Sequence, residues 1–261
     1  MLLAIDVGNT SIIFGVFDGD KLKTTLRITT GVHRMPDEYA ALMLYLLERH
    51  SITASQITDA VLCSVVPPLV TNFEEVCKRY FKISLLAVEA GVKTGVRICM
   101  DNPREVGADR IVNAVAAHKL YKGQVIVIDL GTATTFDAVS EDGDYLGGAI
   151  APGIVIATEA LFTRTAALPR VDLTRPKKAI GTNTVDAMQS GIVFGYVGLI
   201  EGIVNRIKQE LGGKTKVVAT GGYSELLAKE TSAIDVVNPD LTLIGLRLIY
   251  HMNKIETAGK L

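Results

Sequence analysis

The stretch VIVIDLGTATTFDAV, residues 125–139, contains an apolar run typical of a buried β-strand that ends in an acid, Asp129. Gly131 and small hydroxyl residues beginning with Thr132 follow the acid. Glycine at such a turn lets backbone N–H groups approach an anion closely. Because a carboxylate beside that turn would repel phosphate, we expect Asp129 to act through a bound metal ion.

The same pattern occurs at the N-terminus. AIDVGNTSIIFGVFDGDKL (4–22) and VIDLGTATTFDAVSEDGDYL (127–146) share a strand, an acid, a glycine turn, a second strand and a DGD turn. Each copy predicts a three-strand meander closed by a hairpin at DGD. Ordinary hairpin turns would explain either copy alone, but the repetition in both halves favours a pair of phosphate-binding loops.

Helical and strand patterns follow each copy, which indicates an α/β duplication with a nucleotide cleft between its halves. We place an N-terminal domain at residues 1–116 and a C-terminal domain at 117–261. Apolar residues at helical spacing, Tyr39, Leu42, Met43 and Leu46, predict a helix after Pro36. Further helices are expected from Ile154 and after Asn183.

Composition excludes several classes of function. The 261 residues are 48% hydrophobic with a formal net charge of −1, so nothing predicts binding to nucleic acid or to an anionic membrane. GIVFGYVGLIEGIV (191–204) is interrupted by Glu201 and favours a buried core helix over a membrane span. The first residues read as a strand and lack a charged leader. Three cysteines without a CxxC pair are typical of free thiols in a reducing cytoplasm.

A third motif, DNPREVGADRIVNAVAA (101–117), places an acid at the start of an apolar helix. Asp109 could accept a proton from a substrate hydroxyl, with Arg110 as an anion clamp and Gly107 leaving room for backbone approach. The helix dipole alone also favours an acid in a first turn, and the pattern leaves the two explanations evenly balanced. Thr184 has a similar ambiguity between a helix N-cap and a substrate contact.

No GxxxxGK[ST] P-loop and no GxGxxG after a strand occurs in the sequence, so any nucleotide is bound by another loop geometry. DVGNT (6–10), GADR (107–110), DLGTATT (129–135) and GGAIAPG (147–153) stand in the order typical of type III pantothenate kinases. Through these motifs the chain resembles that family over nearly its whole length. The family belongs to the superfamily of acetate and sugar kinases, Hsp70 and actin, whose fold is a duplicated ribonuclease H-like (actin-like ATPase) domain.

The resemblance implies phosphorylation of pantothenate to 4′-phosphopantothenate by ATP, the first step of coenzyme A biosynthesis, in a cytoplasmic homodimer. Asp109 would be the general base. Asp6 would lie near Mg²⁺, directly or through water, and Asp129 would bind a monovalent cation, K⁺ or NH₄⁺. The implied ATP-binding residues are Asp6, Val7, Gly8, Asn9, Thr10, Ser11, Ile12, Ile13 and Thr132; the implied pantothenate-binding residues are Met100, Gly107, Ala108, Asp109, Arg110 and Thr184.

Met100 departs from the family pattern, because many relatives carry a tyrosine two residues before the Asn-Pro. Methionine can pack against the dimethyl group of pantothenate but donates no hydrogen bond. Two other functions remain open on the sequence: a nucleotide-binding accessory protein without kinase activity, and a kinase of the same superfamily that acts on a sugar or acetate. The combination of Asp6, Asp109 and Asp129 argues against the first, and the GADR loop argues against the second.

Overall fold

The computed structural model describes residues 1–258, with side chains to Lys254. Its first sheet has the order β3-β2-β1-β4-β5. The first three strands pair antiparallel, whereas β4 joins β1, and β5 joins β4, in parallel. The predicted meander is therefore confirmed. The strands are β1 (Leu2–Val7), β2 (Ser11–Asp18), β3 (Lys21–Thr29), β4 (Asp59–Ser64) and β5 (Leu85–Ala87).

The second sheet repeats this topology with the order β10-β9-β6-β7-β8. Its three-strand meander, β6-β7-β8, is again antiparallel. On the other side of the central strand β6, β9 pairs with β6 and β10 pairs with β9, both in parallel. The duplication expected from the two acid-glycine motifs is thus present at the level of strand order and direction. The strands are β6 (Gln124–Leu130), β7 (Ala133–Val139), β8 (Tyr145–Pro152), β9 (Thr215–Thr220) and β10 (Val236–Val237).

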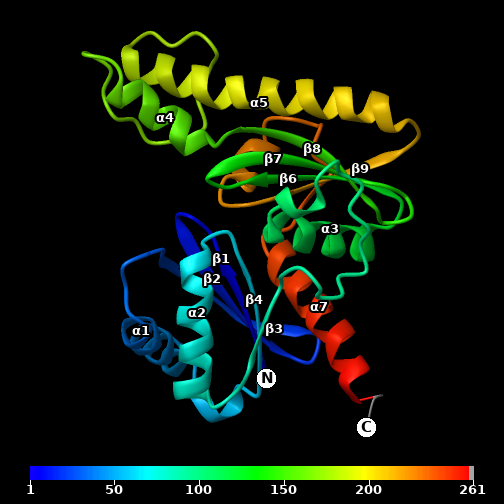
Figure 1. Cartoon of the computed structure of the whole chain (residues 1–261). Helices are drawn as coiled ribbons and strands as arrows, with labels where there is room; N and C mark the ends of the chain where they lie inside the picture. Colours follow the sequence, from blue (N-terminus) through cyan, green and yellow to red (C-terminus); the bar gives the residue numbers. More distant parts are fainter. Residues whose placement is uncertain (259–261) are drawn as a thin grey trace. The chain divides into compact units, whose positions relative to one another are not determined.

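One face of the first sheet packs against α1 (Pro36–Arg49) and α2 (Pro67–Val76), which lie side by side in Figure 1. The expected α1 face is confirmed for Tyr39 and Met43, whereas Leu42 and Leu46 are only half-buried. A π-helical turn (Cys77–Phe81) extends α2. The strand residues of this core are Leu3, Ile5, Val7, Ile12, Phe14, Val16, Ala60 and Leu62.

Side chains alternate along a strand, so Asp6, Ile13 and Cys63 point to the opposite face of the first sheet. The helix α7 (Leu241–Ala258) packs here, since a methyl group at Gly15 would lie 2.8 Å from Leu243 Cδ1. In turn, α7 approaches α3 (Ala108–Tyr121) so closely that a methyl group at Gly245 would lie 2.2 Å from the Val112 carbonyl oxygen.

The second sheet packs on α5 (Thr184–Leu211), with α4 (Ile154–Thr163) beside that helix and α6 (Ser224–Ala228) on the same core. Within residues 1–258, α5 is the one helix whose length and composition would suffice to cross a membrane. Its buried side includes Val193, Ile200 and Val204 and packs in the second core, as predicted for a core helix. Helix α4 begins at the expected residue. Two short 3₁₀ helices are Ala54–Gln56 and Pro103–Glu105.

By its internal contacts the chain forms two compact units. The first contains residues Met1–Gly95 and Asn102–Ala116 and the segment from Thr242 onward; the second contains Val96–Asp101 and Ala117–Leu241. The chain therefore passes between the units four times: on each side of the segment Val96–Asp101, within α3, and at the start of α7. The division into domains 1–116 and 117–261 stays a prediction.

Candidate active site

Asp6 is the next-to-last residue of β1, the central strand of the first unit, which has β2 and β4 as neighbours. In the sheet register it stands beside Ile13 on β2 and Cys63 on β4. Cys63 is fully buried, and its thiol donates a hydrogen bond of 3.4 Å to Asp6 Oδ1. Burial, followed by the charge on Asp6, holds the pKa of the Cys63 thiol well above its usual range. The thiol therefore remains protonated and acts as a weak donor to the carboxylate.

Asp109 lies in the first turn of α3, as the sequence predicts. Its Oδ1 accepts a hydrogen bond of 2.8 Å from the backbone N–H of Arg110. A methyl group at Gly107 would lie 2.5 Å from the same oxygen. Glycine at position 107 therefore leaves room for the Asp109 carboxylate, and any larger residue would displace the proposed base.

The two carboxyl groups of the first unit influence each other. Burial and then the nearby Asp109 charge raise the pKa of Asp6 to about 7, against the opposing effects of the Cys63 hydrogen bond and Arg27. Burial also raises the pKa of Asp109, which the backbone N–H and the charge of Arg110 partly offset. A raised pKa brings a carboxyl group closer to the operating pH, which suits a proton acceptor. A cation bound at Asp6 would favour its ionised form.

The loop after Asp6 is a tight turn whose tip, Asn9 and Thr10, is exposed. The Gly8 N–H donates to the Ser11 carbonyl over 3.0 Å. Thr30, the residue that follows β3, supports the turn, because its hydroxyl donates to the Gly8 carbonyl over 2.7 Å and its N–H donates to the Thr10 carbonyl over 3.1 Å. Neither Thr30 nor Cys63 was predicted as a site residue from the sequence. No local motif marks either residue, since each is far from the loop in the sequence and is brought beside it by strand pairing.

In the second unit Asp129 is likewise the next-to-last residue of its strand, β6, but its neighbours differ. The register places Thr135 of β7 and Thr220 of β9 beside it, where the first unit has an isoleucine and a cysteine. Thr132 lies at the exposed tip of the following turn. A methyl group at Gly153 would lie 2.1 Å from the Thr132 carbonyl oxygen, so the GGAIAPG motif requires glycine here to hold this loop.

Among the described residues there is no group of three or more His, Cys, Asp or Glu side chains that could hold a metal ion. Neither Asp6 nor Asp129 is thus part of a metal cage made of such side chains. Mg²⁺ commonly binds through one or two carboxylates, with water and substrate phosphates as the remaining ligands, and a single carboxylate at Asp6 fits that pattern.

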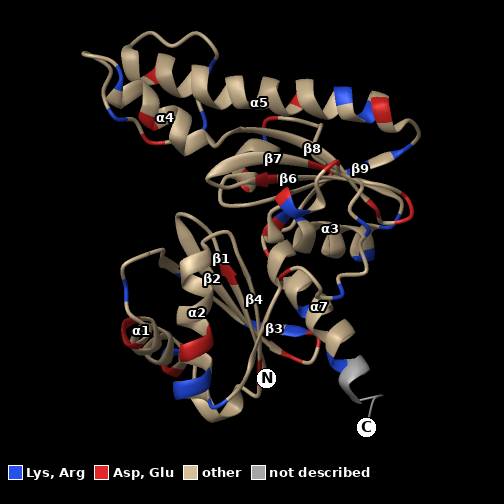
Figure 2. Cartoon of the chain, viewed as in Figure 1, with Lys and Arg blue, Asp and Glu red and all other residues tan. Residues whose placement is uncertain are grey.

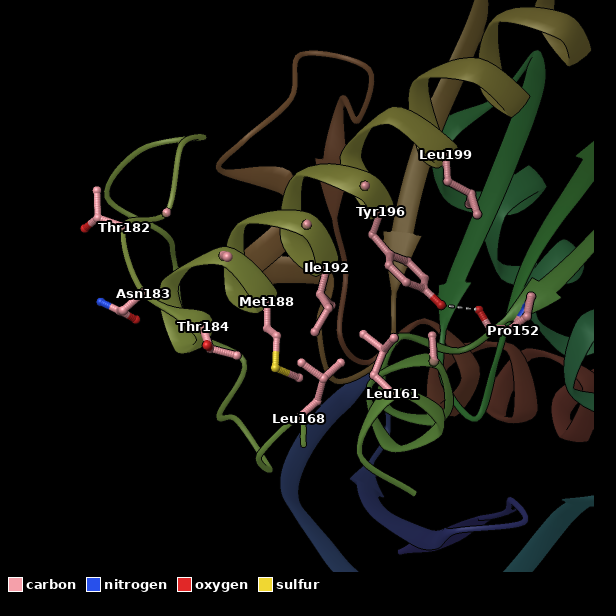
Figure 3. Close-up of a pocket in the computed structure, with 15 residues that line it drawn as sticks. Pro152, Leu161, Leu168, Thr182, Asn183, Thr184, Met188, Ile192, Tyr196 and Leu199 are labelled. Carbon is pink, nitrogen blue, oxygen red and sulfur yellow. Dashed lines mark hydrogen bonds between the residues drawn. The ribbon is translucent and has the colours of Figure 1, made fainter. Parts of the chain in front are cut away.

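Thr184 lines a cavity of about 930 Å³ between α4 and α5 (Figure 3). The expectation that Thr184 caps α5 is wrong: Asn183 is the N-cap and accepts a bond of 2.9 Å from the Asp186 N–H. A hydrogen bond of 2.8 Å from the Tyr196 hydroxyl to the Pro152 carbonyl closes one side of the cavity. The lining is mainly apolar and includes Leu161, Leu168, Met188, Ile192 and Leu199.

The structure does not bring Thr184 together with the other predicted residues of the second unit. Asp129 points to the face of the sheet opposite the α5 core, and Met100 lies at β8, where a methyl group at Gly147 would be 2.9 Å from its Sδ. Neither residue lines the cavity that contains Thr184.

Two sheets of the same strand order, each with an acid and a glycine turn at the end of its central strand, define the actin-like ATPase class of folds, to which sugar kinases belong. Solved structures agree. A conserved putative Baf family transcriptional activator from Campylobacter jejuni superposes with a TM-score of 0.60 at 20% identity, covering 97% of this chain and 98% of that one. A putative 2-dehydro-3-deoxygalactonokinase from Sinorhizobium meliloti gives 0.58 at 14% identity, covering 95% and 98%.

Sequence relatives identify the family within this class. The family model of type III pantothenate kinase matches residues 2–206. A type III pantothenate kinase of Dehalococcoides mccartyi (strain CBDB1) is 56% identical over 254 residues, covering 97% of both chains. That of Myxococcus xanthus is 53% identical over 253 residues, covering 97% of this chain and 99% of the relative. The chain belongs to the type III pantothenate kinase family.

Proposed function

We propose that the protein transfers the γ-phosphoryl group of ATP to the 4′-hydroxyl of pantothenate, the first step of coenzyme A biosynthesis. Membership of the family supports the reaction. The observation that carries the assignment of roles is the carboxylate pair of the first unit, in which Asp6 and Asp109 are close enough for the charge on Asp109 to raise the pKa of Asp6.

In this reaction Asp109 accepts the proton of the pantothenate hydroxyl while that oxygen attacks phosphorus. Its raised pKa improves it as a base, and the Arg110 N–H fixes its orientation. Gly107 leaves room for the carboxylate, Ala108 belongs to the same substrate loop, and Arg110 supplies a positive charge for the substrate. Proton transfer therefore needs no histidine.

The first phosphate loop, residues 6–13, is proposed to bind ATP phosphates through its exposed backbone. Mg²⁺ held by Asp6 would neutralise charge on the phosphate oxygens. In the second unit we assign Thr132 to ATP and Asp129 to the monovalent cation. Two threonines flank Asp129 in the register, and carboxylate and hydroxyl oxygens are hard ligands. Asp6 has no such hydroxyl neighbour in its register, which supports different ions for the two acids.

We further infer that the protein is a homodimer in the cytoplasm. The α4–α5 region exposes apolar side chains, and Figure 2 shows a long uncharged stretch of α5. Thr184 lines the cavity in this region, so a partner chain packed here would complete the pantothenate site. All three cysteines are free, as expected for a reducing compartment. The exposed apolar residues are Ile156, Leu161, Phe162, Ile180 and Val185.

The proposal is tested by ADP release from purified protein with ATP and Mg²⁺, using pantothenate, acetate and a small panel of sugars as acceptors. We expect turnover with pantothenate in K⁺ and a large loss when Na⁺ replaces K⁺. Turnover with a sugar alone would move the protein to another kinase of the superfamily. Nucleotide binding without turnover in any monovalent cation would indicate an accessory protein.

A further inference from the structure

A second buried acid, Asp137, lies on the same sheet face as Asp129 and has no role in the reaction described above. It is fully buried on β7, and both carboxyl oxygens accept hydrogen bonds from hydroxyl groups. Thr135 donates to Oδ2 over 3.0 Å, and Tyr145, itself fully buried, donates to Oδ1 over 2.8 Å. A buried carboxyl group is costly without such partners, so this arrangement fixes both donors.

The first of these donors stands beside the proposed cation ligand. Thr135 is the direct antiparallel partner of Asp129, and side chains of such partners lie next to each other on one face. Asp137 binds the Thr135 hydroxyl hydrogen, which leaves the lone pairs of that oxygen available to a cation. The acid therefore sets the orientation of an oxygen ligand next to Asp129.

The second donor anchors the segment that ends at Met100. The Tyr145 N–H donates to the Arg97 carbonyl over 2.9 Å, and the Cys99 N–H donates to the Tyr145 carbonyl over 2.8 Å. Ile98 and Tyr145 form a parallel bridge, so this segment extends the edge of the second sheet beyond β8. Arg97 adds an ion pair with Asp144.

The sheet itself does not require an acid at this position. In the first unit the residue two positions beyond the partner of Asp6 is Gly15, and α7 packs directly against it. In the second unit the equivalent register position, two residues beyond Thr135, is Asp137. The duplicated fold thus tolerates glycine there, and the acid is particular to the half that carries Asp129 and Met100.

We propose that Asp137 and Tyr145 are positioning residues, whose hydrogen bond links the Thr135 hydroxyl beside Asp129 to the Arg97–Met100 segment beside β8. Loss of this bond is expected to weaken the monovalent-cation site and pantothenate binding together. The cation part rests on the assignment of Asp129 made above, and the pantothenate part rests on Met100 as a pantothenate contact, which the family resemblance implies.

The test compares Tyr145→Phe with Tyr250→Phe. Tyr250 also donates its hydroxyl to an acid, Asp59, but at the opposite end of β4 from Cys63, so its loss removes the same kind of bond far from the loop. For Tyr145→Phe we expect the KM for pantothenate and the half-activating K⁺ concentration each to rise about tenfold, a change typical of one hydrogen bond to a charged group, with kcat at saturation changed less than threefold. Tyr250→Phe should leave both values unchanged.

A second readout does not depend on turnover. Wild-type protein should gain a higher Tm in KCl than in NaCl, and Tyr145→Phe should lose at least half of that gain. If Tyr145→Phe does not fold, Asp137→Asn replaces it. A comparison of Thr135→Val with Thr135→Ser tests the K⁺ response alone, since serine retains the hydroxyl and valine does not.

Equal behaviour of Tyr145→Phe and Tyr250→Phe in KM and in K⁺ response would overturn the proposal. A wild type that does not distinguish KCl from NaCl in activity or Tm would instead refute the cation assignment of Asp129, and an unchanged KM for pantothenate in Tyr145→Phe would then refute the positioning role as well.

Discussion

Asp109 has a common structural explanation as well as the chemical role that we propose for it. An acid in a first helical turn is favoured by the helix dipole alone. Here the carboxyl group also accepts a hydrogen bond from the Arg110 N–H, and Gly107 leaves room for it. Burial raises the pKa of this group. We expect Asp109→Asn to lower kcat by roughly two to four orders of magnitude, the range for a positioned acid–base group, with folding intact. Full activity of this variant in a steady-state assay would exclude Asp109 as the base.

Asp6 makes stability depend on pH in a defined direction. Its pKa is about 7 in the folded chain, above the usual value of 3.8. Between pH 3.8 and pH 7 the Asp6 carboxyl group is therefore protonated in the folded state and ionised in the unfolded state. The free energy of unfolding should therefore fall as the pH rises from about 4 to about 7, with no further loss from this group above that range. In the absence of divalent cations, Asp6→Asn should be more stable than wild type at pH 8 by about 1–3 kcal/mol, because the amide carries no charge.

Denaturant unfolding at pH 5 and pH 8, with and without MgATP, measures this effect. The exposed Asp18→Asn is the control and should follow wild type at both pH values. MgATP should stabilise wild type more than Asp6→Asn. Identical pH dependence of wild type and Asp6→Asn would show that Asp6 is not the group that titrates.

Single residues could be predicted from the sequence where a repeat marked them and not otherwise. Asp6 and Asp129 could be identified because the same short motif surrounds both, although they stand more than a hundred residues apart. The repeated motif identified the ends of both central strands. Cys63 and Thr220 could not be found in this way, because they reach those acids through parallel pairing with strands far along the chain. Parallel register depends on tertiary packing, which no local spacing encodes.

At the start of α5, the helix cap is Asn183, and we assign the proposed pantothenate contact to its neighbour, Thr184. Asn183 accepts the Asp186 N–H and donates its own amide to the Asp186 carboxylate over 2.8 Å, while the side chain of Thr184 lines the cavity. We expect Asn183→Ala to lower the free energy of unfolding by about 1 kcal/mol. Thr184→Val should leave stability nearly unchanged and raise the KM for pantothenate. Thermal melts and pantothenate titrations separate the two, and a large stability loss in Thr184→Val would contradict this division.

The elements themselves were predictable to different extents. DGD turns and alternating strands identified both meanders, since a tight hairpin is a local structure. The edge segment Arg97–Cys99 was missed, because its bonds to Tyr145 join residues about 50 positions apart and its sequence has no alternation. The cap of α5 was misplaced by one residue because asparagine and threonine are both good N-caps and stand next to each other.

Across the whole chain, the two sheets share one topology, but the residues around their two acids differ. Both sheets end their central strand in an acid, yet one acid has a thiol and an isoleucine beside it and the other has two threonines. The covering helices differ as well: α1 and α2 are largely paired with each other and the first sheet, whereas α5 buries one side and exposes another. The exposed side of α5 is where we place the second protomer.

Gly198 tests this placement directly. It is exposed on α5, and a side chain added there would meet nothing within 4 Å of its Cβ in the same chain. Gly198→Arg should leave the protomer at least as stable, since arginine favours a helix over glycine by up to about 1 kcal/mol, but it should disrupt a helix-to-helix contact with a partner. We expect sedimentation to show a monomer in place of a dimer, and the KM for pantothenate to rise because the cavity around Thr184 loses the chain that completes it.

Gln209→Arg adds the same charge at the other, exposed end of α5 and should remain dimeric and active. A dimeric and fully active Gly198→Arg would place any subunit contact on a different surface.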